Sequence, residues 1–81
     1  MQVRFLLFAL YRDLAGAEEL SLDVPAGTTA AEAVHRLRGQ GPGFARIPER
    51  PVVAINRTYA PLHTPLQEDD ELALLPPVAG G

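Results

Sequence analysis

The sequence predicts an α+β domain in which one main helix packs against one face of a four-stranded mixed sheet. The predicted segments follow the order strand, strand, helix, strand, strand, which is typical of a sheet with a single covering helix. Only one long segment carries helix signals. At 81 residues, of which 47% are hydrophobic, the chain suits one small domain with a single core. It is too short to build a deep enzyme cleft as well.

The first half of the sheet is predicted from alternation of apolar residues. Val3 to Phe8 is expected to be a strand, with Val3, Phe5 and Leu7 on one face and Arg4, Leu6 and Phe8 on the other. Tyr11 to Gly16 is typical of a short helical turn that ends at a glycine. Glu19 to Val24 alternates strictly, which indicates a half-buried strand.

The main helix is expected to follow Pro25-Ala26-Gly27. Thr29 is a suitable N-cap, and Glu32 three residues later completes a capping box. A narrow apolar stripe follows at helical spacing, made of Ala30, Ala33, Val34 and Leu37. Gly39 ends the helix, and residues 39–51, rich in glycine and proline, are expected to cross the surface.

The second half of the sheet is predicted to contain two more strands. Val52 to Asn56 is a short strand, residues 56–65 are loop, and Glu71 to Leu75 is the final strand. The acidic run before this last strand indicates a tight turn in which Asp69 takes a left-handed backbone.

Placing the helix in a right-handed crossover between the two halves makes the first and last strands central and parallel. That is the β-grasp arrangement. Residues 1–75 are expected to form the domain and residues 76–81 an extended tail. The predicted core consists of the apolar residues that face the helix: Val3, Phe5, Leu7, Leu20, Leu22, Val24, Ala33, Val34, Leu37, Val53, Ile55, Leu72 and Leu74.

Composition excludes several classes of function. The net charge of −3 and the scattered arginines argue against nucleic acid as a partner. Neither a membrane span nor a secretory signal is visible, so we expect a cytoplasmic protein. The chain has no cysteine, and His35 and His63 lack neighbours at metal-ligand spacing, so we expect neither a metal site nor catalysis by this chain alone.

The last six residues are the most informative stretch. Pro76 and Pro77 favour an extended backbone, and the chain then ends in Gly80-Gly81. Six extended residues reach about 20 Å, far enough to carry a terminal carboxylate into another protein's active site. The alternative is a frayed terminus. The two glycines favour a tail that enters an active site, because a backbone without Cβ atoms can pass through a narrow channel.

One helix covers only one face of the sheet. On the open face Phe8 and Leu75 end the two central strands beside the tail, and Tyr59 belongs to a loop that could approach them. Apolar side chains gathered at the root of a tail are typical of a partner surface.

The C-terminal segment Leu66 to Gly81, which ends Pro-Pro-Val-Ala-Gly-Gly, resembles the signature of the molybdopterin synthase small subunit, the MoaD family of ubiquitin-like sulfur carriers. Val3 to Leu14 is similar to that family's first strand and turn. One departure is Asp69, where the family usually has glycine. The Pro-Pro-Val-x-Gly-Gly ending is specific, whereas a bare Gly-Gly would fit any sulfur carrier or ubiquitin-like modifier.

The resemblance implies a chemistry and a set of partners. Gly81 would be adenylated with ATP by an E1-like, MoeB-like activating enzyme, and a sulfur donor protein would then convert it to a thiocarboxylate. The large subunit, MoaE, would hold the catalytic groups and the acceptor, cyclic pyranopterin monophosphate, in a heterotetramer with two small subunits. Gly80 would be the thin spacer, and Pro76, Pro77 and Val78 would join Phe8, Tyr59 and Leu75 at the interface. No cofactor is expected to bind this chain.

Two other functions stay open at this point. The chain could carry sulfur for thiamin or for tRNA thiolation. It could instead be a ubiquitin-like modifier, with Gly81 in amide linkage to target lysines. The chain itself has no lysine, so it offers no side chain for isopeptide attachment.

Overall fold

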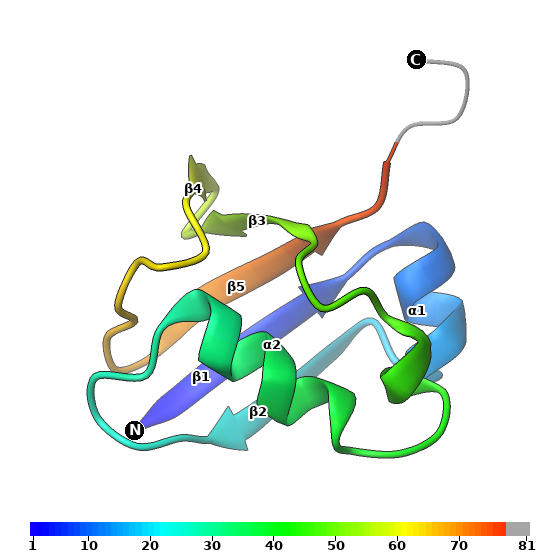
Figure 1. Ribbon diagram of the computed structural model, residues 1–81, viewed down its shortest axis with the longest axis horizontal. Helices are drawn as coiled ribbons and strands as arrows, with labels where there is room; N and C mark the ends of the chain where they lie inside the picture. Colours follow the sequence, from blue (N-terminus) through cyan, green and yellow to red (C-terminus); the bar gives the residue numbers. More distant parts are fainter. Residues whose placement is uncertain (78–81) are drawn as a thin grey trace.

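The protein is built on a five-stranded mixed sheet in the order β2-β1-β5-β3-β4 (Figure 1). The computed structural model describes residues 1–77. At the centre, β1 (Gln2–Leu7) pairs in parallel with β5 (Asp70–Leu75) and antiparallel with β2 (Glu19–Asp23). On the other side of β5 lie β3 (Val52–Ile55) and β4 (Thr58–Ala60), both in antiparallel pairing. The predicted parallel central pair is therefore confirmed.

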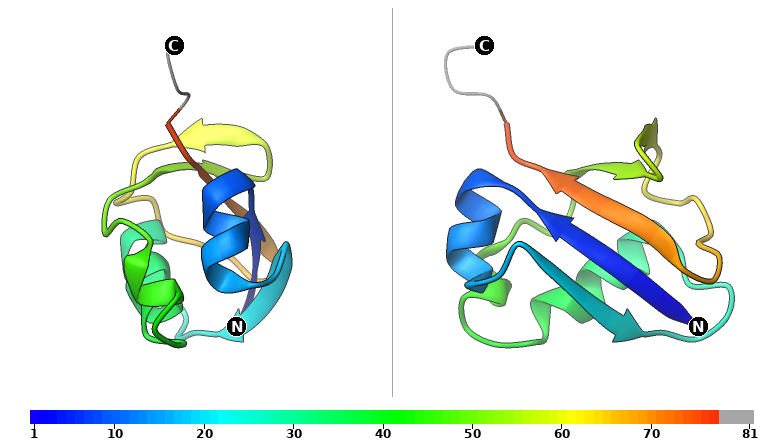
Figure 2. Two further views of the ribbon diagram at one scale, coloured as in Figure 1. Left: turned by 90° about the vertical axis from the view of Figure 1, so that its right-hand side faces the viewer. Right: turned by 180° about the vertical axis from the view of Figure 1, so that it is seen from behind.

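One main helix, α2 (Ala30–Arg38), packs across one face of this sheet, and no helix of residues 1–77 covers the opposite face (Figure 2). The shorter α1 (Ala9–Ala15) lies at the end of the sheet where β1 and β5 finish, and a 3-10 turn, η1 (Phe44–Arg46), lies in the crossover after α2. These layers confirm the α+β, β-grasp prediction. Within residues 1–77, no helix is long and apolar enough to span a membrane.

Local hydrogen bonds explain where α2 begins. The Thr29 hydroxyl accepts a hydrogen bond from the Glu32 backbone N–H at 3.2 Å, and the Glu32 carboxylate accepts one from the Thr29 N–H at 3.0 Å. This is the predicted capping box, and its hydrogen bonds lower the pKa of Glu32. All four residues of the predicted stripe, Ala30, Ala33, Val34 and Leu37, are buried, and the helix ends before Gly39 as expected.

The core lies between α2 and the sheet. Phe5, Leu72 and Leu74 are fully enclosed, as predicted. Leu20, Leu22 and Ile55 are only partly buried. For Leu20 and Leu22 the reason is that β2 is the outermost strand, which has a neighbouring strand on one side only.

The core also contains three residues that were not predicted, Tyr11, Ile47 and Leu66. They lie in short or irregular segments in which the apolar residues show no regular spacing. Burial raises the pKa of Tyr11.

The predicted strand count was wrong. Residues 58–60, expected to be loop, form β4, which is joined to β3 by the two-residue turn Asn56-Arg57. Both turn residues have positive φ, 50° and 71°, as a tight hairpin turn of the primed type requires. The turn was missed because arginine stands where glycine usually marks such a turn.

Several boundaries also differ from the prediction by one or two residues; β2, for example, ends at Asp23 rather than Val24, and β5 begins at Asp70 rather than Glu71. The first strand ends at Leu7, and Phe8 precedes α1, which begins at Ala9 rather than Tyr11. The third strand ends at Ile55, because Asn56 enters the turn. Asp69 has a φ of 63°, which confirms the left-handed turn before β5 and explains how this sequence manages without glycine there.

Gly43 makes a close approach that no other residue could make. A Cβ at this position would overlap the backbone carbonyl of Leu14 at the end of α1. We therefore expect Gly43→Ala to lower the free energy of unfolding by about 1–3 kcal/mol, because backbone must move to relieve the overlap. Gly41→Ala is the matched control, since its Cβ would lie at an ordinary 3.6 Å from the Phe44 ring. Urea denaturation of both variants checks this, and equal stabilities would contradict it.

The two faces of β5 predict opposite effects for neighbouring leucines. Leu74 is fully buried under α2, so Leu74→Ala should leave a cavity and cost about 2–5 kcal/mol of unfolding free energy. Leu75 faces the open side, so Leu75→Ala should cost no more than about 1 kcal/mol. Thermal and urea unfolding measure both, and the reverse order would mean that the face assignment is inverted.

Candidate functional site: the open face and the tail root

The strand register sets three rows of side chains on the part of the open face nearest the tail. The first of these rows pairs Arg4 with Glu71. The middle row crosses four strands and contains Leu6, Ala73, Ala54 and Tyr59. The row nearest the tail pairs Leu75 with Val52. The face therefore changes from charged to apolar toward the end where the chain leaves the domain.

The middle of this face is hollowed. Ala54 and Ala73, both only 7% exposed, carry single methyl groups between larger neighbours. The result is an open depression of about 420 Å³. Its lining consists of Leu6, Phe8, Ala54, Arg57, Tyr59, Glu71, Ala73 and Leu75. A shallow, largely apolar hollow of this kind fits a protruding side chain of a partner protein better than a deeply bound small molecule.

The structure brings together the three apolar residues that the sequence assigned to this surface. Phe8, Leu75 and Tyr59 all line the depression, and Tyr59 stands on β4 rather than in a loop, with 75% of its surface exposed. That they bind a partner stays a prediction. Val52, which is 57% exposed beside Leu75, also belongs to this surface, although it was not predicted from the sequence. The sequence does indicate the orientation of Val52: because Val53 and Ile55 point inward on the same strand, alternation places Val52 on the other side of the sheet.

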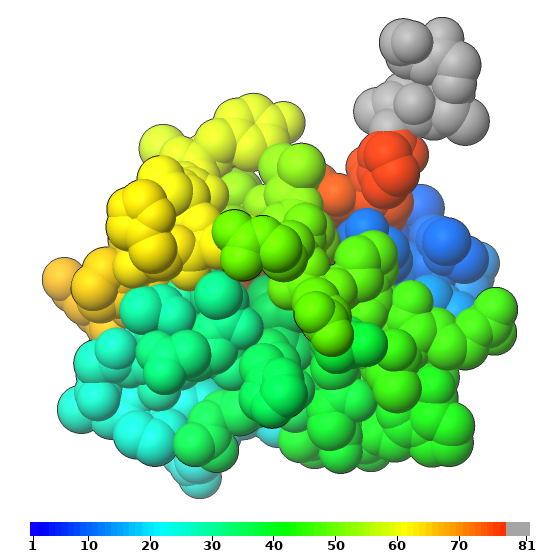
Figure 3. All heavy atoms as spheres, in the orientation of Figure 1, coloured from blue at the N-terminus to red at the C-terminus, as the bar shows by residue number. Residues whose placement is uncertain are grey.

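The root of the tail lies at the apolar end of this face. Because β1 and β5 are parallel, both finish at the same end of the sheet, next to α1 (Figure 1). The chain passes from Leu75 to a half-buried Pro76 and an exposed Pro77 at the edge of the molecule (Figure 3). The predicted site residues Val78, Gly80 and Gly81 lie outside the described residues.

The charged groups of the open face differ in how they are paired. Arg4 lies 3.8 Å from Glu71 and 3.6 Å from Glu19, which places it between two carboxylates. The Glu71 side chain is 15% exposed, so this pair is partly sheltered. Arg57 also lines the depression, yet no carboxylate of residues 1–77 lies within 4 Å of its guanidinium.

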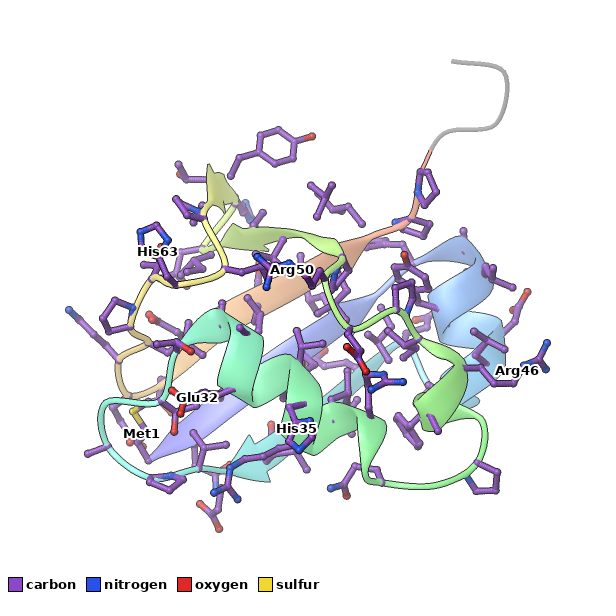
Figure 4. The ribbon with its side chains drawn as sticks, in the orientation of Figure 1. Met1, Glu32, His35, Arg46, Arg50 and His63 are labelled. Atoms are coloured by element: carbon purple, nitrogen blue, oxygen red, sulfur yellow. The ribbon has the colours of Figure 1, made fainter. Side chains whose placement is uncertain are left out.

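The two histidines lie away from this site. His35 is exposed on α2 and His63 is exposed in the segment between β4 and β5 (Figure 4). Among residues 1–77, no three His, Cys, Asp or Glu side chains are grouped so that they could hold a metal ion. Neither histidine therefore belongs to the depression on the open face.

Comparisons with known proteins agree with this geometry. The model of the ThiS family matches residues 5–81. The chain is 33% identical to the molybdopterin synthase sulfur carrier subunit of Arabidopsis thaliana, over 100% of this chain and 84% of that protein. Its structure is similar to that of small archaeal modifier protein 1 from Haloferax volcanii, with a TM-score of 0.87 and 29% identity over the whole of both chains.

A third similarity is to a chain in the complex of subunits 1 and 2 of the molybdopterin-converting factor from Helicobacter pylori. There the TM-score is 0.71 and the identity 26%, again over 100% of both chains. The matches extend over nearly all of the sequence and include its C-terminus. The chain therefore belongs to the ThiS family, and within it to the group of molybdopterin synthase sulfur carrier subunits.

Proposed function

We propose that this protein is the sulfur-carrying small subunit of a molybdopterin synthase, and that its C-terminal Gly81 carries the sulfur as a thiocarboxylate. The observation that supports this most strongly is the family match, which continues through Gly81. The chain has no cysteine, so no thiol can carry the sulfur, whereas the terminal carboxyl of Gly81 can hold it as a reactive acyl derivative once it is activated.

The proposed chemistry begins with an unreactive carboxylate. An oxygen of the Gly81 carboxylate attacks the α-phosphorus of ATP on the activating enzyme, and pyrophosphate leaves. Sulfide (HS⁻) supplied by the donor protein then attacks the acyl carbon, AMP leaves, and loss of the S–H proton gives the thiocarboxylate. The resulting thiocarboxylate is a good nucleophile. ATP is bound by the activating enzyme, and this chain holds neither nucleotide nor metal in any step.

The acceptor and the remaining catalytic groups belong to the large subunit. The domain docks through the depression on its open face while the tail enters the partner's active site. There the sulfur is transferred to cyclic pyranopterin monophosphate. A dithiolene contains two sulfur atoms, so two charged small subunits act for each product, which fits a heterotetramer. The similar chain from Helicobacter pylori was solved in a complex of subunits 1 and 2 of the molybdopterin-converting factor, which supports a large-subunit partner. We infer that these steps take place in the cytoplasm.

A second candidate function is protein modification. The similarity to small archaeal modifier protein 1 favours it, because that similarity extends over the whole chain. Both functions begin with an adenylated Gly81. They differ in the attacking group, which is sulfur in a carrier and a lysine amine in a modifier. A sulfur carrier for thiamin or tRNA would share the thiocarboxylate and differ in its acceptor.

Incubation with activating enzyme, ATP and a sulfur source should convert Gly81 to a thiocarboxylate. The expected result in intact-mass spectrometry is a shift that corresponds to exchange of one oxygen for sulfur, located in the C-terminal peptide. Removal of Gly81 should abolish the shift without unfolding the domain, because the core described in residues 1–77 is formed by other residues. A protein that keeps its original mass under conditions that sulfurate a known carrier would contradict the proposal.

Loss of an apolar side chain from the depression should weaken the complex with the large subunit. Burial of Phe or Leu contributes roughly 1.5–3 kcal/mol, so Phe8→Ala and Leu75→Ala should each raise the Kd at least about tenfold. Leu10→Ala is the matched control, since Leu10 is 58% exposed and does not line the depression. Its Kd should stay within about twofold. Calorimetric titration measures all three, and equal effects would argue against docking at this face.

A further inference from the structure

We propose that Arg57 determines partner specificity on the open face, by meeting a carboxylate that the large subunit presents beside its apolar contact. This inference rests on the proposed function, and it states which chemical group the partner must present at the interface. It is carried by three observations: the place of Arg57 in the depression, the way its backbone is held, and the absence of a carboxylate partner for it among residues 1–77.

The backbone of Arg57 is held by its neighbour. The Asn56 N–H donates to the Glu71 carbonyl at 2.9 Å, and the Asn56 side-chain oxygen accepts from the Glu71 N–H at 3.0 Å. The Asn56 amide nitrogen also donates to the Asp70 carboxylate at 2.8 Å. These bonds tie the β3–β4 turn to the start of β5. The guanidinium therefore projects from a fixed point at the charged side of the hollow.

The charges around the hollow leave Arg57 as the group that needs a partner. Arg4 lies between Glu71 and Glu19, within 4 Å of both. A protein that covers the apolar residues of the depression also covers Arg57, because they line the same hollow. Removing an unpaired charge from water is strongly unfavourable, so a matching partner supplies an anion at this point. The planar guanidinium suits a carboxylate, which it can bind through two parallel hydrogen bonds.

The chain contains a matched arginine on the other side of the molecule. Arg50 lines a separate depression on the α2 side with Ala31, His35, Arg38 and Glu49 (Figure 4). Like Arg57 it is exposed and has no carboxylate within 4 Å among residues 1–77. The same charge change at Arg50 alters the net charge equally without altering the open face. It therefore separates a local contact from a general electrostatic effect.

The test compares Arg57→Asp with Arg50→Asp in binding to the large synthase subunit encoded by the same genome. Aspartate tolerates positive φ, so the turn should persist. Affinity is measured at ionic strengths of about 0.01 and 0.15 M, where the Debye length is about 30 and 8 Å. Arg57→Asp is expected to raise the Kd on the order of tenfold at low salt and less at higher salt, whereas Arg50→Asp stays within about twofold. Thermal melting confirms that each variant is folded.

Arg57→Asn keeps the test decisive if the aspartate variant unfolds, since it removes the charge with a side chain that also suits this turn. It should weaken binding a few-fold, again more at low salt. Equal effects of the substitutions at positions 57 and 50, or tighter binding by Arg57→Asp, would overturn the assignment of Arg57 alone. Failure of the unaltered protein to bind the large subunit at all would overturn the proposed function together with it.

Discussion

The parallel pairing of β1 with β5 is the constraint on which the rest of the structure depends. It joins the first and last strands of the chain at the centre of the sheet, with Val3 opposite Asp70 and Leu7 opposite Leu74. The alternation of side chains along these two strands then divides the residues between two faces. One face builds the core, and the other forms the open surface with the depression.

The same pairing determines where the chain leaves the domain. Since parallel strands finish at the same end, Phe8 and Leu75 meet where the tail leaves the domain. An apolar surface and the root of the tail, Pro76 and Pro77, are thereby placed at the same end of a domain that buries one small core. The main helix α2 covers one face of the sheet, and the hollow of about 420 Å³ on the other face is open to solvent. That division of labour is consistent with a substrate-carrying subunit whose chemistry is completed on other proteins.

Much of the fold could be predicted because local signals and global packing agree. The capping box at Thr29, the apolar stripe through Leu37 and the alternation in β5 each point to one arrangement. The additional strand β4 could not be predicted, because the turn before it depends on hydrogen bonds between Asn56 and residues of β5 that are distant in sequence. The depression on the open face could not be predicted from the sequence either. Ala54 and Ala73 carry little signal alone, and they form a hollow only once the register places them side by side. The role of Arg57 likewise depends on which carboxylates lie near it in space.

The intact mass of the protein purified from its native host tests the central claim most directly. The account predicts a mixture of two free C-terminal forms, one with the Gly81 carboxylate and one with a single oxygen replaced by sulfur. Chemical trapping of the thiocarboxylate should shift the second form and leave the first unchanged. Recovery of Gly81 mainly in amide linkage to lysines of other proteins, with no thiocarboxylate form, would contradict the sulfur-carrier account and favour protein modification.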